Sequence, residues 1–118
     1  MDANSIAVSI ARQLGYQCLG LIGATNLTPG VVVENGFPYI KFNVGHNSKN
    51  VTHVVIYYNP IDDLYDFEFF SKPEYVEDIR NNSFKPVSSQ RGAQASEFYE
   101  ILEKHADLQT TIYKKNRP

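Results

Sequence analysis

The stretch that decides the fold is VTHVVIYYNPIDDLYDFEFF, at Val51–Phe70. It contains two halves rich in β-branched and aromatic residues, Val51–Tyr58 and Leu64–Phe70, on either side of the turn signal NPIDD. Such a pattern is typical of two adjacent strands. In the second half, aromatic residues alternate with acidic ones, so one face of the strand is dry and the other is wet. This alternation predicts an antiparallel sheet that is covered on one side only.

Two amphipathic segments are expected to form the helices that cover this side of the sheet. Asn4–Leu14 carries apolar residues at the i, i+3, i+4 and i+7 positions of a helix, and Gly15 is suited to end it. A second helix is predicted from about Arg91 to His105 on the same spacing. The predicted fold is α+β: a two-layer antiparallel sheet of three to five strands with both helices on one face.

The other strands are predicted with less regular patterns. Gln17–Ile22 is apolar on both faces and is interpreted as a short interior strand, whereas Tyr39–Val44 alternates as a half-buried strand should. Within Leu27–Pro38 we expect a short edge strand at VVV, between the turn signals TPG and NG. Ser71–Gln90 has no sustained period and is predicted to be a long loop.

Length and composition favour a single domain, residues 1–118, with a frayed basic tail at 114–118. The chain has 118 residues, 42% of them hydrophobic, which is enough to form a hydrophobic core without the help of disulfides or metals. A formal net charge of −2 weakens the case for nucleic-acid binding, which usually needs a basic stripe. The single cysteine, Cys18, is expected to be buried and inert. With no signal peptide and no long apolar run, we expect a cytoplasmic protein without membrane contact.

The wet face of the sheet is the candidate binding surface. Alternation assigns to it five residues that the fold does not need, which are Lys41, His53, Tyr57, Asp66 and Glu68. Tyrosine is enriched in binding hot spots, so Tyr57 is the expected anchor. His53 is a further candidate, as a base oriented by Asp66, although no nucleophile is marked by its spacing.

The acidic residues Asp62, Asp63, Asp66 and Glu68 leave a cation site open as an alternative to turn chemistry and a solvated face. No metal, cofactor or catalytic residue is predicted from them. The strand aromatics leave a second alternative, in which single-stranded nucleic acid stacks on the open sheet face. Only Lys41 is a neighbouring cation, and the two β-strand carboxylates would repel phosphate, so this alternative ranks second.

Three motifs, in order, carry a resemblance to a known group. IARQLG at 10–15, LIGATNL at 21–27 and DLYDFEF at 63–69 resemble the "QLGG", "TGAKNF" and "DLYDVEF" motifs of small hypothetical proteins of phages and mobile elements. The loops Leu27–Pro38 and Ser71–Gln90 depart from that pattern. The group has no established activity, so the resemblance transfers no functional residue and implies only a small accessory protein.

Together these observations lead to an expected function. The chain is predicted to be a non-enzymatic accessory protein of a phage or mobile element that acts in the host cytoplasm through protein–protein contact. By analogy with anti-CRISPR proteins, the expected partner is a component of a host defence system. The alternative is a nucleic-acid-binding accessory protein.

Overall fold

A computed structural model describes residues 3–71 and 85–110. It confirms the α+β class: a five-stranded antiparallel sheet with helices from both ends of the chain. The elements, in chain order, are α1 (Ala3–Leu14), α2 (Tyr16–Leu21), β1 (Thr25–Val31), β2 (Pro38–Asn43), β3 (His53–Asn59), β4 (Leu64–Phe70), β5 (Ser88–Ala93), the short 3₁₀ helix η1 (Ala95–Glu97) and α4 (Phe98–Ala106).

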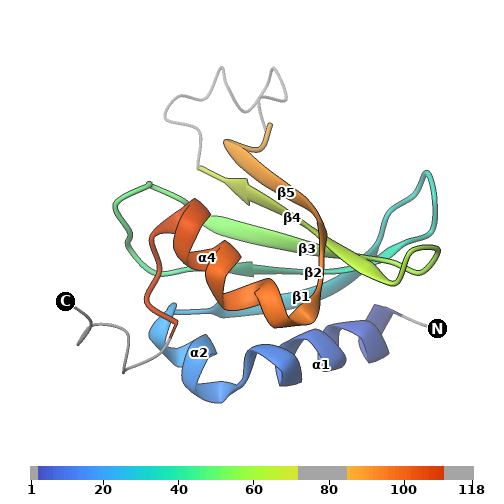
Figure 1. Ribbon diagram of the computed structural model, residues 1–118, viewed down its shortest axis with the longest axis horizontal. Helices are drawn as coiled ribbons and strands as arrows, with labels where there is room; N and C mark the ends of the chain where they lie inside the picture. The colour runs from blue at the N-terminus through green and yellow to red at the C-terminus, as the bar shows by residue number, and fades with distance from the viewer. Residues whose placement is uncertain (1–2, 72–84, 111–118) are drawn as a thin grey trace.

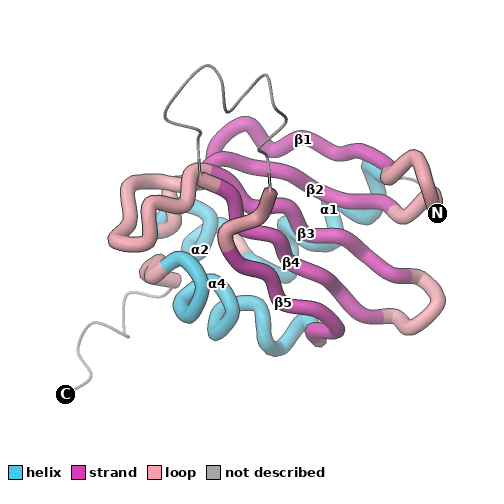
Figure 2. The backbone as a smooth tube through the Cα atoms, turned by 90° about the horizontal axis from the view of Figure 1, so that it is seen from above, coloured by secondary structure: helices cyan, strands magenta, loops and turns pink. Residues whose placement is uncertain are grey.

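The sheet is a meander in the order β1-β2-β3-β4-β5, and every strand pairs with its neighbour in the sequence (Figure 2). The two strands predicted within Val51–Phe70 are β3 and β4, at the centre of the sheet. They are joined by seven register pairs, from His53–Phe70 to Asn59–Leu64. The predicted turn between them is tight: the Asp63 N–H donates to the Asn59 carbonyl at 2.9 Å. The two predicted strands therefore pair with each other as antiparallel neighbours.

All three α-helices lie on one face of the sheet (Figure 1). The core lies between the layers, where the rings of Phe42, Phe67 and Phe98 and the side chain of Leu102 are at most 1% exposed. Phe98 meets Phe67 edge-on, with ring centroids 5.3 Å apart. This two-layer packing confirms the prediction that both amphipathic helices cover the same face.

Gln17–Ile22 is not a strand, and the prediction for it was wrong. Most of it belongs to α2, whose last turn is closed by the Ile22 N–H donating to the Cys18 carbonyl at 2.9 Å. Gly15, at φ 85°, lets the chain turn after α1 and begin a second helix at once. The helix buries Cys18 and leaves Tyr16 96% exposed, so its apolar run covers a corner of the core instead of lying within the sheet.

The edge strand is also displaced from its predicted position, because the TPG sequence lies inside β1 and not in a turn. Val32 and Phe37 form a hydrogen-bonded pair, with 2.9 Å between the Val32 nitrogen and the Phe37 oxygen. Since such pairs alternate along an antiparallel ladder, the backbone of Pro29 faces away from β2, where its missing N–H breaks no ladder bond. Gly30 lies under the ring of Tyr39, which would come within 2.3 Å of an added Cβ.

The predicted boundary between the long loop and the second helix was wrong. Ser88–Ala93 forms β5, so the loop ends before Gln90 and the helix does not begin at Arg91. Helical structure starts after Gln94, where a capping box joins Gln94 and Glu97 through each other's backbone N–H groups. Residues 72–84 of the predicted loop and the tail at 114–118 lie outside the described residues.

A hydrogen bond ties the two ends of the described fold together. The Tyr99 hydroxyl of α4 donates to the backbone carbonyl of Leu14, at the end of α1, at 2.6 Å. This carbonyl is among those that the end of a helix leaves without an intrahelical partner. The contact joins residues 85 positions apart in the sequence.

Candidate binding face and strand-end cavity

The five predicted site residues all lie on the face of the sheet that points away from the helices, hereafter the open face. The register places these residues and their cross-strand partners in three rows. The rows are Tyr39, Tyr57 and Asp66; Lys41, Val55, Glu68 and Ser89; and Asn43, His53 and Phe70. Their sequence neighbours on β2, β3 and β4 point into the core. Alternation thus brings the five predicted residues onto one surface.

Tyr57 is the centre of this face. Its hydroxyl donates to Glu68 Oε1 at 2.5 Å, and its ring meets that of Tyr39 edge-on with centroids 5.7 Å apart. Partial burial, followed by the hydrogen bond to Glu68 and the charge of that residue, raises the pKa of Tyr57 above its ordinary value. The side chain is therefore held in one orientation and stays protonated at neutral pH.

A groove of about 340 Å³ crosses the open face beside this pair. Phe37 and Tyr57 contribute apolar surface to it, Asp66 and Glu68 contribute carboxylates, and Arg91 of β5 borders it. The volume lies near the lower end of the range for ligand pockets. The groove therefore combines an aromatic anchor, two acidic groups and one basic group.

His53 and Asp66 do not form a base and its orienting acid. His53 lies opposite Phe70, and the two rings stack with centroids 4.7 Å apart, whereas Asp66 lies opposite Tyr57. Asp66 instead accepts a hydrogen bond from the Gly92 N–H at 2.9 Å, beside the irregular register of β5. Burial and, to a smaller extent, the nearby charge of Lys41 lower the pKa of His53 below its ordinary value.

The other acidic residues of the predicted cluster are engaged in the β3–β4 turn. Asp63 has φ 56° and accepts a hydrogen bond from the Tyr58 hydroxyl at 2.7 Å, and Asp62 lies 3.3 Å from the Asn59 amide nitrogen. Within residues 3–71 and 85–110, no group of three His, Cys, Asp or Glu side chains is placed to hold a metal ion.

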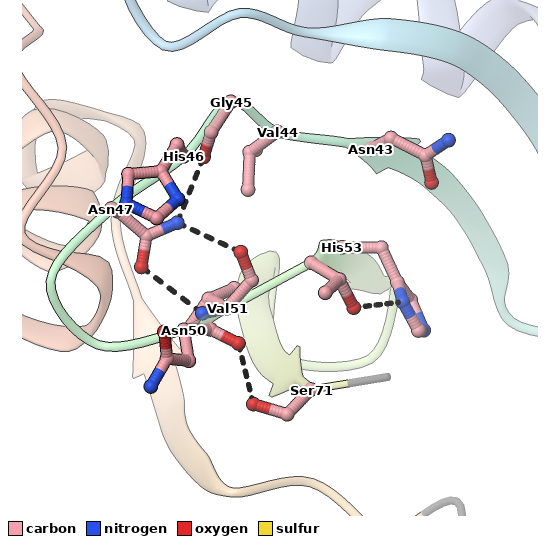
Figure 3. A pocket seen from close by; sticks show the side chains of 10 residues that line it. Asn43, Val44, Gly45, His46, Asn47, Asn50, Val51, His53 and Ser71 are labelled. Carbon is pink, nitrogen blue, oxygen red and sulfur yellow. Dashed lines mark hydrogen bonds between the residues drawn. The ribbon is translucent and has the colours of Figure 1, made fainter. Parts of the chain in front are cut away.

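Sequence reasoning missed a larger cavity at the end of β2 and β3, hereafter the strand-end cavity. It has a volume of about 590 Å³, and its lining comes from residues 43–47 and 50–53 together with Ser71 (Figure 3). The side chain of Asn47 shapes it by donating to the Gly45 and Val51 carbonyls and accepting from the Val51 N–H. The available signal in the sequence was the density of amide and imidazole groups in the polar run GHNSKN at 45–50.

Comparisons with known proteins add no relative to this picture. No family model matches the chain, and neither the curated proteins nor the solved structures that were searched contain a significant match. None of the helices in the described part of the chain is long and apolar enough to cross a membrane.

Proposed function

We propose that the protein is a non-enzymatic binding module that uses the groove on its open face to hold a segment of a partner protein. The observation that carries this proposal is the composition of the groove, where Tyr57 lies beside two carboxylates of the neighbouring strand: Asp66 is opposite it, and Glu68 accepts a hydrogen bond from its hydroxyl. An apolar ring flanked by acidic groups complements a lysine or arginine side chain, whose apolar stem and cationic head match the two kinds of surface. The partner segment therefore presents a basic residue.

Preorganisation supports this role. The hydrogen bond to Glu68 fixes the Tyr57 hydroxyl, and Tyr39 packs against the edge of its ring before any partner arrives. Binding then immobilises fewer side chains, which reduces the entropic cost of association. Arg91, at the β5 border of the groove, supplies a position for an acidic neighbour in the same segment.

Nucleic-acid binding is the second candidate, because Tyr39 and Tyr57 are aromatic rings on an open sheet face. Their neighbours Asp66 and Glu68 oppose a phosphate backbone, which favours the protein partner. The identity of that partner as a host-defence component, and an origin in a phage or mobile element, rest on the sequence resemblance alone and stay predictions.

A selection from a random peptide library tests the proposal. Peptides selected on the wild-type protein should be enriched in lysine or arginine. Tyr57→Ala combined with Asp66→Lys should abolish their binding while circular dichroism shows an intact fold. Glu100→Lys is the matched control, because it makes the same charge change on the exposed surface of α4 and should leave binding unchanged.

Three outcomes contradict the proposal. One is a peptide selection without enrichment of basic residues. Another is a folded double variant that keeps its peptides. The third is nanomolar binding of single-stranded DNA or RNA by the wild type at physiological salt, which would favour the second candidate.

A further inference from the structure

We propose that the strand-end cavity binds a small phosphate ester, with the phosphate at the end formed by Asn43 and His53. Asn43 and His53 are register partners on adjacent strands, so their side chains reach the same end of the cavity. His46 lies at the opposite end (Figure 3). A cavity of about 590 Å³ is larger than a phosphate, which leaves room for an organic group over Val44 and Val51.

The lining contains side-chain hydrogen-bond donors that are available to a ligand, and it contains no carboxylate. The described part of the chain offers no hydrogen-bond partner to the side chains of Asn43, His46 and Asn50, and each of them can donate to a ligand. The Ser71 hydroxyl already donates to the Asn50 carbonyl at 2.6 Å. In a chain with more acidic than basic residues, a cavity lined only by amide, imidazole, hydroxyl and apolar groups is a place where an anion meets little repulsion.

The hydrogen bonds of His53 show which nitrogen is available. Thr52 Oγ1 donates to the Phe70 carbonyl at 3.2 Å, so its lone pairs accept from His53 Nδ1, also at 3.2 Å. Nε2 is then the nitrogen that gains a proton beside an anion. On the flanking strands, Lys41 and Glu68 are the charged groups one row away, and Glu68 is already paired with Tyr57.

Binding should therefore strengthen as the pH falls through the pKa of His53, which lies below its ordinary value in the free protein. An anion that favours the protonated ring must raise that pKa, by linkage. Inorganic sulfate is a suitable probe for this effect, because it keeps its charge across the range from about pH 5 to 8 in which histidine titrates.

The test is an NMR titration of the full chain with adenosine 5′-monophosphate, adenosine and sulfate. We expect saturable shifts of the residue 43–53 amides with the monophosphate and with sulfate, none with adenosine, and a rise in the pKa of His53. Asn43→Asp, at an exposed position, and His53→Gln should each weaken monophosphate binding by roughly ten- to a hundredfold, the loss expected for one charge-assisted hydrogen bond.

His105→Gln is the matched control, because His105 is a half-buried histidine on the helix-covered side of the sheet and its change should leave binding intact. Equal binding of adenosine and its monophosphate overturns the proposal, as does the absence of saturable shifts or an equal loss in the control. The test is separate from that of the open face: Tyr57→Ala should abolish peptide binding and leave monophosphate binding unchanged.

Discussion

Replacing Phe67 by alanine should reveal how much of the stability depends on the packing between sheet and helices. The ring is fully buried, and its centroid lies 5.3 Å from that of Phe98 and 6.1 Å from that of Phe69. Phe67→Ala removes a large apolar group and leaves a cavity, at a cost of about 3–5 kcal/mol in the free energy of unfolding. A domain of this kind is stable by about 5–15 kcal/mol in total, so the variant should fold with a much smaller margin.

Urea denaturation measures the loss. For a slope of about 2 kcal/mol per molar, a loss of about 4 kcal/mol lowers the midpoint by about 2 M. The control is Asp66→Ala on the same strand, which removes one hydrogen bond to the Gly92 N–H and should cost about 0.5–1.5 kcal/mol. Equal midpoint shifts for the two variants would refute the assignment of Phe67 to the core and of Asp66 to the open face.

Three further predictions concern single groups. Burial and, to a smaller extent, the charge of Glu103 raise the pKa of Cys18 to about 11. A thiol-reactive dye at neutral pH should therefore label the folded protein far more slowly than the urea-unfolded chain. Equal labelling rates would contradict this. Because the folded state holds the Tyr57 proton more tightly than the unfolded chain does, the stability due to this group should be complete below about pH 10 and disappear as the pH rises through the folded pKa. Glu68→Gln should lower that pKa in a tyrosinate absorbance titration referenced to Tyr57→Phe, and an unchanged value would count against the pairing. Gly30→Ala should displace the Tyr39 ring and cost about 1–3 kcal/mol, less when combined with Tyr39→Ala, and strict additivity in the double-mutant cycle would exclude that contact.

The central strands could be predicted from the sequence because their physical causes are local. In Tyr39–Val44 and Leu64–Phe70 the polarity of each side chain indicates which face of the sheet it lies on. Burial in the structure follows the same alternation. That alternation also places Tyr57 and Glu68 on the open face. It does not reveal the hydrogen bond between them, which depends on the diagonal geometry of two paired strands.

The errors occurred where local sequence underdetermines structure. A short apolar run such as Cys18–Ile22, most of which lies in α2, fits a strand or a helix equally well, and the turn at Gly15 decided between them. The β5 strand SSQRGA carries no apolar periodicity at all; it is held by pairing with β4, with Ala93 its one buried residue. TPG has the composition of a turn, but an edge strand tolerates proline, and Tyr39 covers the glycine.

The strand-end cavity was beyond sequence reasoning for a different reason. Its walls come from two strand ends and the loop between them, and Ser71 joins them from the end of β4. The loop is shaped by one amide, that of Asn47, whose four hydrogen bonds link residues up to four positions away. Composition shows that such a loop is polar, but it does not show that it encloses a space.

The hydrogen bond from Tyr99 to Leu14 has a consequence for how the molecule opens. In a meander each strand pairs only with its sequence neighbours, so either edge could peel away while the rest stayed folded. The contact between α4 and the end of α1 joins the two ends of the described fold across one continuous core. Opening either end then requires breaking this contact, which favours a single cooperative unfolding event with similar hydrogen-exchange protection in α1 and α4.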